Sequence, residues 1–372
     1  MVFFMKKICS YNLIGQVGFG LTAAGAISAY CLCLCAVLNQ GAFVALAITA
    51  IFALASIKRK FIYAPSPLLA VVFFYLLQFN SLVTATLSLC LGVLICFTIS
   101  KLTNRREIPN FIAGGCLIGL ALCATILYTN AYFGIGASGY TPLEMLKSYR
   151  SLGFHPDFRG LLYGTITLFT MITYPFKFRK LKNIIPAEFI TVAIPFVLNL
   201  ILNPDPARTT TNEYTSFNLY GKIYAPSGIG VILGSGIVTG ILLYVLTQNS
   251  QGGKTGNFIT AHPVIPCTTR EYKGIAPVVA IIVPVAIILL FPTLIKRLPL
   301  PSAGAMLIVS AWQHTSFKPL SATLKEKSIF KFLLLILCGT LFVVLPASMA
   351  ISICLVMWLT TELINRRREA SV

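Results

Sequence analysis

Long apolar runs separated by short polar stretches fill this chain from Leu13 to Leu363. Several of the runs are shorter than the roughly 20 residues that a bilayer-crossing helix needs, which is typical of half-helices and of segments shielded by other helices. The pattern therefore predicts an all-α polytopic membrane protein with about twelve membrane segments. The predicted segments are Leu13–Leu38, Ala42–Ile57, Pro65–Phe79, Leu82–Ile99, Phe111–Tyr128, Leu161–Tyr174, Phe189–Leu202, Ile229–Thr247, Ile275–Ile295, Leu300–Trp312, Ile329–Val343 and Ala347–Leu363.

Composition supports a membrane location. Of the 372 residues, 57% are hydrophobic and only 10% are charged, and the mean hydropathy is +0.85. A soluble domain carries about 25% charged residues. We therefore expect one transmembrane domain over residues 1–372 and no soluble domain. Because Met1–Asn12 is short and basic and the next apolar run is long enough to span, a cleavable signal peptide is not expected.

The net charge of +19 does not indicate a nucleic-acid partner, because the basic residues sit in short loops between apolar runs. If the N-terminus is inside and every segment reverses the chain, most of the 29 lysines and arginines fall on the cytoplasmic side. This bias predicts both termini in the cytoplasm, for a protein of a bacterial inner membrane. Anionic lipid head groups or an anionic substrate are the expected partners of the excess positive charge.

Neither metal nor catalytic chemistry is indicated. The 11 cysteines fall mostly within apolar runs, where they act as small packing residues. Among Cys31, Cys33 and Cys35, only the outer two share a helix face, and no histidine or carboxylate joins them. The ten acidic residues lie mainly in loops, and none stands with a histidine at a useful spacing. We therefore expect no metal, no cofactor and no enzyme.

The stretch from Tyr63 to Phe79 begins with two prolines and continues as an uncharged apolar run. Proline suits the first turn of a helix, so a helix is predicted to begin near Pro65. At about 15 residues, or roughly 22 Å, this helix is too short to cross a hydrocarbon core of roughly 30 Å. A helix that begins inside a membrane protein offers unpaired N–H groups and a positive dipole end to an anion. The alternative is a short or tilted ordinary span. Pro263–Arg270 is a possible counterpart in the second half.

Other local signals predict connecting structure. A short surface helix is expected around Pro142–Tyr149, and Asn203–Ser227, rich in Pro, Thr and Asn, is expected to be an external loop.

The stretch from Ile108 to Gly119 resembles the SulP (sulfate permease) family of anion transporters. That family has a proline, a glycine six residues later and another glycine four beyond it, matched here by Pro109, Gly115 and Gly119. The two glycines form a small-xxx-small face that lets helices approach closely. The resemblance spans nearly the whole chain in order, at low identity. Its other motifs are Gly20–Thr22, Ala64–Ser66, Ile184–Thr191, Leu298–Trp312 and Phe332–Met357.

This resemblance implies two inverted repeats, here placed in residues 1–203 and, in shortened form, residues 204–372. It implies that a core domain, which holds the anion between the N-termini of two facing half-helices, moves as an elevator against a gate domain. The substrate-binding residues carried over from the family are Ala64, Pro65, Ser66, Pro263, Cys267, Thr268, Thr269, Arg270 and Gln248. Members of the family are often dimers, so a homodimer is expected.

The chain also departs from the family. Gln248 stands where an acidic residue is usual, and the family's Pro-Gln pair of the first helix falls near Ala29-Tyr30. Residues 248–274 are too few for the two segments that the family places there, and the STAS domain typical of the family is not expected here.

The candidate side chains have alternative roles. Ser66, Thr268 and Thr269 could bind an oxyanion or cap helices. Arg270 could neutralise an anion or lie in a cytoplasmic loop.

The sequence favours a secondary transporter or exchanger of a small inorganic or carboxylate anion, in the sulfate, bicarbonate or chloride class. The alternative is a non-transporting membrane scaffold or partner subunit that kept the fold but lost the second half-helix. The arrangement of the chain at Pro65 and Pro263 distinguishes the two: helix ends that face each other across a polar cavity favour transport.

Overall fold

The computed structural model of the chain describes most of its length. The described residues are 2–370 except for 39–60, 66, 81, 103–108, 138, 140, 154–155, 157, 179–180, 182–184, 204–227, 250–260, 267–275, 291–296, 314, 316 and 327.

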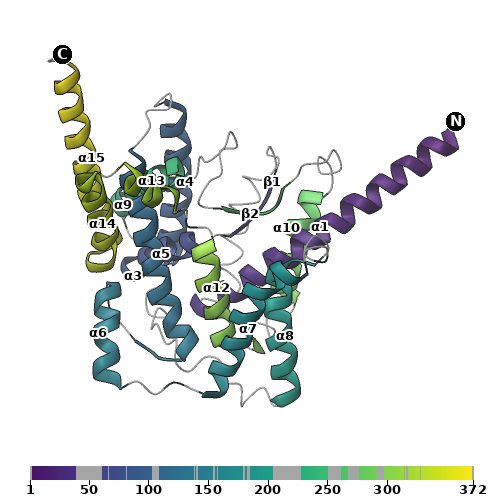
Figure 1. Cartoon of the computed structure of the whole chain (residues 1–372). Coiled ribbons are helices and arrows are strands. Elements are labelled where there is room, and N and C mark those ends of the chain that lie inside the picture. The colour runs from purple at the N-terminus through teal and green to yellow at the C-terminus, as the bar shows by residue number, and fades with distance from the viewer. Residues whose placement is uncertain are drawn as a thin grey trace.

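Thirteen helices and two short strands make up this described part (Figure 1). In chain order they are α1 (Val2–Leu38), β1 (Phe61–Pro65), α3 (Pro67–Phe79), α4 (Leu82–Leu102), α5 (Asn110–Phe133), α6 (Pro142–Leu152), α7 (Phe158–Lys177), α8 (Ala187–Leu202), α9 (Ile229–Asn249), β2 (Ala261–Pro266), α10 (Ala276–Leu290), α12 (Leu300–Gln313), α13 (Lys318–Lys325), α14 (Ile329–Val344) and α15 (Ala347–Ala370).

The predicted all-α architecture is confirmed, with the two strands as a local addition. Every predicted membrane segment except Ala42–Ile57 coincides with a helix; Ala42–Ile57 lies outside the described residues. The predicted surface helix is present as α6, whereas α13 and both strands were not expected. Nearly all of the expected external loop, residues 204–227, also lies outside the described part.

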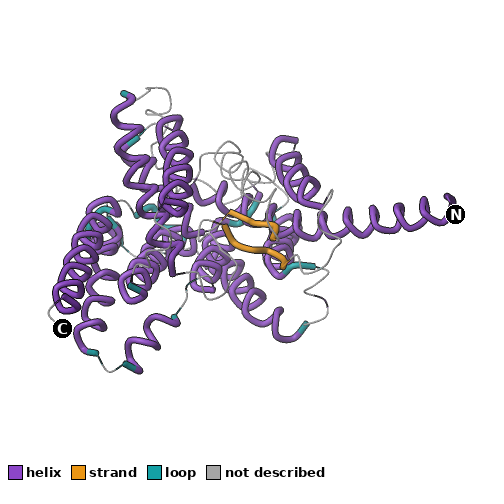
Figure 2. Tube along the Cα trace, turned by 90° about the horizontal axis from the view of Figure 1, so that it is seen from above, coloured by secondary structure: helices purple, strands orange, loops and turns teal. Residues whose placement is uncertain are grey.

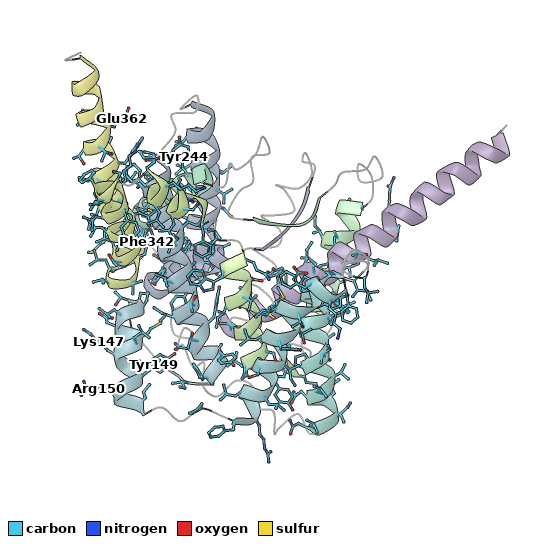
Figure 3. All side chains as sticks on the ribbon, in the orientation of Figure 1. Lys147, Tyr149, Arg150, Tyr244, Phe342 and Glu362 are labelled. Carbon is cyan, nitrogen blue, oxygen red and sulfur yellow. The ribbon has the colours of Figure 1, made fainter. Side chains whose placement is uncertain are left out.

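Local sequence explains where the surface helices begin. The Thr141 side chain accepts a hydrogen bond from the Glu144 backbone N–H, and Pro142 occupies the first turn of α6. Figure 3 shows Lys147 and Arg150 of α6 pointing away from the bundle. Because one face is polar and Met145 is buried on the other, α6 lies on the surface of the bundle.

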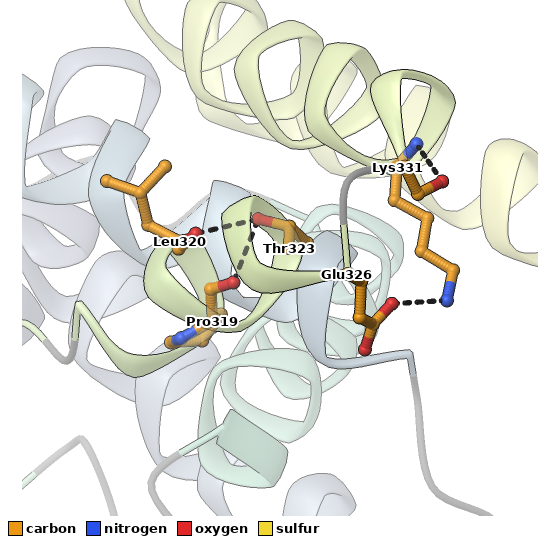
Figure 4. Close-up of polar contacts among 6 residues, drawn as sticks. Pro319, Leu320, Thr323, Glu326 and Lys331 are labelled. Atoms are coloured by element: carbon orange, nitrogen blue, oxygen red, sulfur yellow. Dashed lines mark hydrogen bonds and ion pairs between the residues drawn. The ribbon is translucent and has the colours of Figure 1, made fainter.

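The connection from α13 to α14 is also polar (Figure 4). The Thr323 hydroxyl donates to the backbone carbonyl groups of Pro319 and Leu320 within α13. Glu326 and Lys331 form an exposed ion pair of 2.6 Å across the gap to α14. An exposed pair of this kind contributes little stability.

The helices pack in matching pairs drawn from the two halves of the chain. In one set α4 packs on α9 and α1 packs on α10; in the other α5 packs on α14 and α12 packs on α7. If α1 corresponds to α9, α4 to α10, α5 to α12 and α7 to α14, the α4–α9 pair corresponds to the α1–α10 pair. The α5–α14 pair then corresponds to the α12–α7 pair. This is the packing that two related repeats produce.

The relation between the halves is an inverted one. β1 and β2, which would be equivalent, pair with each other antiparallel. Helices α5 and α12 also run antiparallel, because Trp312 near the end of α12 donates to Thr125 in α5, whereas Gly304 near its start lies against Tyr128 and Tyr132. We use the family's terms for the two parts: the core domain contains α1, α3, α4, α9, α10 and the strands, and the gate domain contains α5 to α8 and α12 to α15.

Two glycines of α5 allow close contact with α14 in the gate domain. A Cβ atom on Gly115 would lie 2.5 Å from the carbonyl oxygen of Leu335, and one on Gly119 would lie 2.7 Å from that of Gly339. Both contacts are with backbone atoms of α14, which cannot move aside. The small-xxx-small face predicted for Gly115 and Gly119 is therefore confirmed.

The outer surface of the bundle is apolar. In the described part of the chain, two helices, Gln16–Leu34 within α1 and Phe111–Phe133 within α5, are long and apolar enough to cross a membrane by length and composition, and the further apolar helices found there are shorter. Phe169 and Phe176 on α7 and Phe330 on α14 are 69%, 73% and 64% exposed. Large exposed apolar side chains on several outer helices suit contact with lipid rather than water.

Candidate functional site

Two proline-containing segments from opposite halves meet at the centre of the fold. β1 and β2 form a two-stranded antiparallel ladder in which Tyr63 faces Pro263, Ala64 faces His262 and Pro65 faces Ala261. Figure 2 shows the strands lying among helices rather than at the edge of the molecule. Figure 1 places the ladder between the α4–α9 pair and the α1–α10 pair.

The predicted helix starts at these prolines need correction. Pro65 ends β1 and α3 begins two residues later, at Pro67, while Pro263 lies within β2. Proline occurs in strands at the edge of a sheet, and in the two-stranded sheet of the described residues both strands are edge strands. The two segments are therefore neighbours as expected, but as paired strands rather than as facing helix ends.

Helix α3 has the properties predicted for a half-helix. Its 13 residues span about 20 Å, less than the thickness of a bilayer core. Its first residues, Pro67 and Leu68, are buried, so the helix begins inside the protein. The helix packs against α1, α4, α5 and α12, which belong to both domains.

A tyrosine of the gate domain holds the start of α3. The hydroxyl of Tyr128 on α5 donates to the backbone carbonyl oxygen of Pro67 at 2.5 Å, and the Tyr128 side chain is fully buried. A hydrogen bond in this low-dielectric environment fixes the position of the helix N-terminus relative to α5.

A second tyrosine joins α1 to the gate domain. The hydroxyl groups of Tyr30 on α1 and Ser310 on α12 are 2.8 Å apart, and the Cys33 thiol lies 3.3 Å from the Met306 sulfur one turn away. The Tyr30 hydroxyl is thus bonded to α12.

A cavity of about 250 Å³ lies at the opposite end of α3 from the ladder. Its walls come from the second half of α3, from α9 and from Pro346 between α14 and α15. Most of the lining is apolar, with hydroxyl groups from Ser235 and Thr239. It therefore differs from the polar cavity expected between the two helix ends.

Some of the predicted substrate-binding residues lie within the described part of the structure, and others lie outside it. Ala64 and Pro65 lie in β1, Pro263 lies in β2, and Gln248 lies in the last turn of α9. The ladder brings the first three together. The remaining candidates lie outside the described residues: Ser66, Cys267, Thr268, Thr269 and Arg270.

The second half has little chain for an equivalent of α3. Helix α10 packs on α1 as α4 packs on α9, so α10 corresponds to α4. In the first half, α3 lies between β1 and α4. In the second half only residues 267–275, outside the described part, separate β2 from α10.

One further cluster had no signal in the sequence. The thiols of Cys116 on α5, Cys338 on α14 and Cys354 on α15 all lie within 4.8 Å of one another. Because these cysteines come from three separate helices, no local spacing could have linked them.

No protein-family model matches the chain, and no curated protein matches it by sequence. Solved structures match it closely in fold. The transmembrane domain of a cyanobacterium bicarbonate transporter, BicA, superposes with a TM-score of 0.60 at 16% identity, over 92% of this chain and 97% of that one. The murine anion transporter Slc26a9, in its inward-facing state, superposes with a TM-score of 0.61 at 14% identity, over 93% of this chain and 69% of that one. This chain has the SulP-type anion-transporter fold.

The resemblance seen in the motifs is therefore confirmed for the fold. A second SLC26A9 structure agrees, with a TM-score of 0.63 at 14% identity over 94% of this chain and 66% of that one. The chain thus has the fold of the multi-pass membrane domains of these transporters. At such low identity the match describes the fold, and the function is argued separately below.

Proposed function

We propose that this protein is a secondary transporter or exchanger of a small anion. The observation that carries the proposal is the buried start of α3 beside the β1–β2 ladder, at the meeting of the two halves. The proteins that share this fold are described as a bicarbonate transporter and an anion transporter, which supports the same function here.

The N-terminus of α3 supplies the attraction for an anion. A helix N-terminus carries a positive partial charge and directs backbone N–H groups outward, so it binds anions without needing a cationic side chain. The chain has a net charge of +19, which raises the local concentration of anions near it. A helix N-terminus can bind bicarbonate, chloride, sulfate or a small carboxylate in this way.

The proposed movement is an elevator-type displacement of the core domain against the gate domain. Two buried hydrogen bonds cross that boundary, one from Tyr128 to Pro67 and one between Tyr30 and Ser310. Each joins a core element to a gate helix, so each has to break when the core domain slides. These bonds would stabilise the present conformation relative to its counterpart.

Anion flux into proteoliposomes tests the proposal. Purified protein is reconstituted, and uptake of sulfate, bicarbonate, chloride and small dicarboxylates is followed beside a Ser66→Leu, Arg270→Ala double variant. Lys331→Ala serves as the control, because it removes a basic residue of an exposed ion pair on α14. Saturable uptake of one anion, lost in the double variant and kept in the control, is the expected result. Uptake that survives in the double variant would keep the function and remove Ser66 and Arg270 from the site.

A non-transporting scaffold or partner subunit is the second candidate. It is favoured by the short connection of residues 267–275, where a second half-helix would be needed. It is also favoured by the strand pairing at Pro65 and Pro263, where a transporter was expected to have helix ends facing each other across a polar cavity. Absence of flux for every anion, from protein that is monodisperse and unfolds cooperatively, would establish this alternative.

Location, orientation and oligomeric state belong to the same proposal. We infer a homodimer in a bacterial inner membrane with both termini in the cytoplasm. Labelling of terminal cysteine tags from either side of the membrane tests the orientation, and the mass of the reconstituted particle tests the dimer.

A further inference from the structure

Three cysteines meet inside the gate domain, away from the proposed anion site. The Cys116, Cys338 and Cys354 side chains are 0%, 0% and 1% exposed, and their sulfur atoms all lie within 4.8 Å of one another. Among the described residues, this group contains no histidine or carboxylate. The arrangement is a triangle of soft sulfur donors.

The scaffold around the triangle is tightly packed. Gly115, next to Cys116, lies so close to α14 that a Cβ atom there would be 2.8 Å from the Cβ atom of Cys338. On the same two helices, Cys123 donates to the backbone carbonyl oxygen of Phe342 at 3.0 Å. Two corners of the triangle are therefore held by close backbone contact, and α15 supplies the third.

The size of the triangle suits a trigonal metal ion. Metal–thiolate bonds are roughly 2.3 Å long, so three sulfur atoms around one ion are about 4 Å apart. Sulfur atoms within 4.8 Å of one another reach that separation through small side-chain rotations. Zinc in structural sites requires four ligands, and this group offers three. Thiolate sulfur favours copper(I), which accepts two or three such ligands.

We propose that Cys116, Cys338 and Cys354 form a binding site for a soft monovalent metal ion of the copper(I) class. Two of the three thiols bind copper(I) as thiolates and release their S–H protons to solvent, and the third binds as a neutral thiol. The site then carries a net charge of −1, whereas three thiolates would leave −2, so keeping one proton lowers the cost of burying charge inside a membrane protein. The ion joins α5, α14 and α15 within the gate domain. This proposal is independent of the anion-transport proposal.

The test uses the full chain, purified in detergent under reducing and anaerobic conditions. In one variant every cysteine except Cys116, Cys338 and Cys354 is replaced by serine, and copper(I) is offered in competition with a chromophoric chelator. We expect one copper(I) per chain, sulfur ligands at roughly 2.3 Å by X-ray absorption, and a higher unfolding temperature on loading. Adding Cys354→Ser to this variant should weaken binding at least tenfold. Zinc(II) should bind far more weakly than copper(I).

A second comparison covers the case in which that variant fails to fold. In the otherwise native chain, Cys116→Ser should lose one bound copper(I) and its thermal stabilisation. Cys90→Ser, which changes a partly exposed cysteine of α4, should keep both. Failure to hold copper(I) against the chelator, or equal binding by Cys116→Ser and Cys90→Ser, would overturn the proposal. So would formation of a disulfide between two of the three cysteines in place of metal binding.

Discussion

Replacing Tyr128 with phenylalanine removes one hydroxyl from the boundary between the two domains. The Tyr128 hydroxyl donates to the Pro67 carbonyl oxygen at 2.5 Å, and the whole side chain is buried. A buried hydrogen bond contributes about 1 kcal/mol net. The loss stays near that value because the Pro67 carbonyl, at the start of α3, can still accept the ordinary helical bond from four residues later. Phenylalanine fills the same space, so no large cavity is added.

This loss should be visible in both stability and transport. We expect the unfolding temperature of Tyr128→Phe to fall by about 1–3 °C. If the bond has to break before the core domain slides, removing about 1 kcal/mol from this conformation raises the rate of leaving it about fivefold. The maximal rate of anion flux in proteoliposomes should therefore rise, by up to this factor.

A neighbouring tyrosine provides the control. Tyr132 lies one turn further along α5, and its hydroxyl is exposed and 3.3 Å from the Thr165 hydroxyl. Tyr132→Phe should leave flux and unfolding temperature unchanged. The reasoning is refuted if Tyr128→Phe behaves like Tyr132→Phe in both assays, because the bond would then not join the two domains energetically.

Three other predictions follow from the packing. Gly115→Ala should destabilise the protein by about 1–3 kcal/mol in thermal unfolding, since its Cβ atom would meet a backbone oxygen at 2.5 Å; Gly230→Ala, which meets nothing within 4 Å, should not. Ala64→Cys with His262→Cys should form a disulfide on mild oxidation, seen by mass spectrometry and absent from each single variant, because paired strand residues lie within disulfide range. Burial raises the pKa of Tyr149 to about 12, above its usual value near 10. The stability that the protonated side chain contributes is therefore complete below pH 10 and is lost as the pH rises toward 12. Tyr149→Phe should remove that part of the pH dependence of the free energy of unfolding.

Much of the helical architecture could be predicted because apolar runs report directly on membrane segments. The surface helix α6 was also predictable, since Thr141, Pro142 and Glu144 carry a local start signal. The strands were not, because each has only five or six residues and contains proline. Each is stabilised by a partner about 200 residues away, and such long-range pairing leaves no trace in local periodicity.

The same limit applies to the sites. The proline motifs marked the two segments that meet at the centre, and the ladder between Ala64 and His262 bears out their proximity. Their exact form could not be read from the sequence, because a proline can end a strand as well as begin a helix. The contacts of Tyr128 and the three-cysteine cluster depend on which helices pack together, so they can be identified in the structure but not in the sequence.

The two halves differ most at the place where an anion would bind. Their helices pack in equivalent pairs and their strands face each other, yet β1 leads into the 13-residue α3, whereas β2 is followed by residues 267–275 and then α10. A site built on helix N-termini would then draw most of its attraction from α3. It follows that Ser66→Leu, next to the start of α3, should reduce flux more than Arg270→Ala does. Equal losses from the two single changes would show instead that both halves contribute alike, despite the shorter connection in the second.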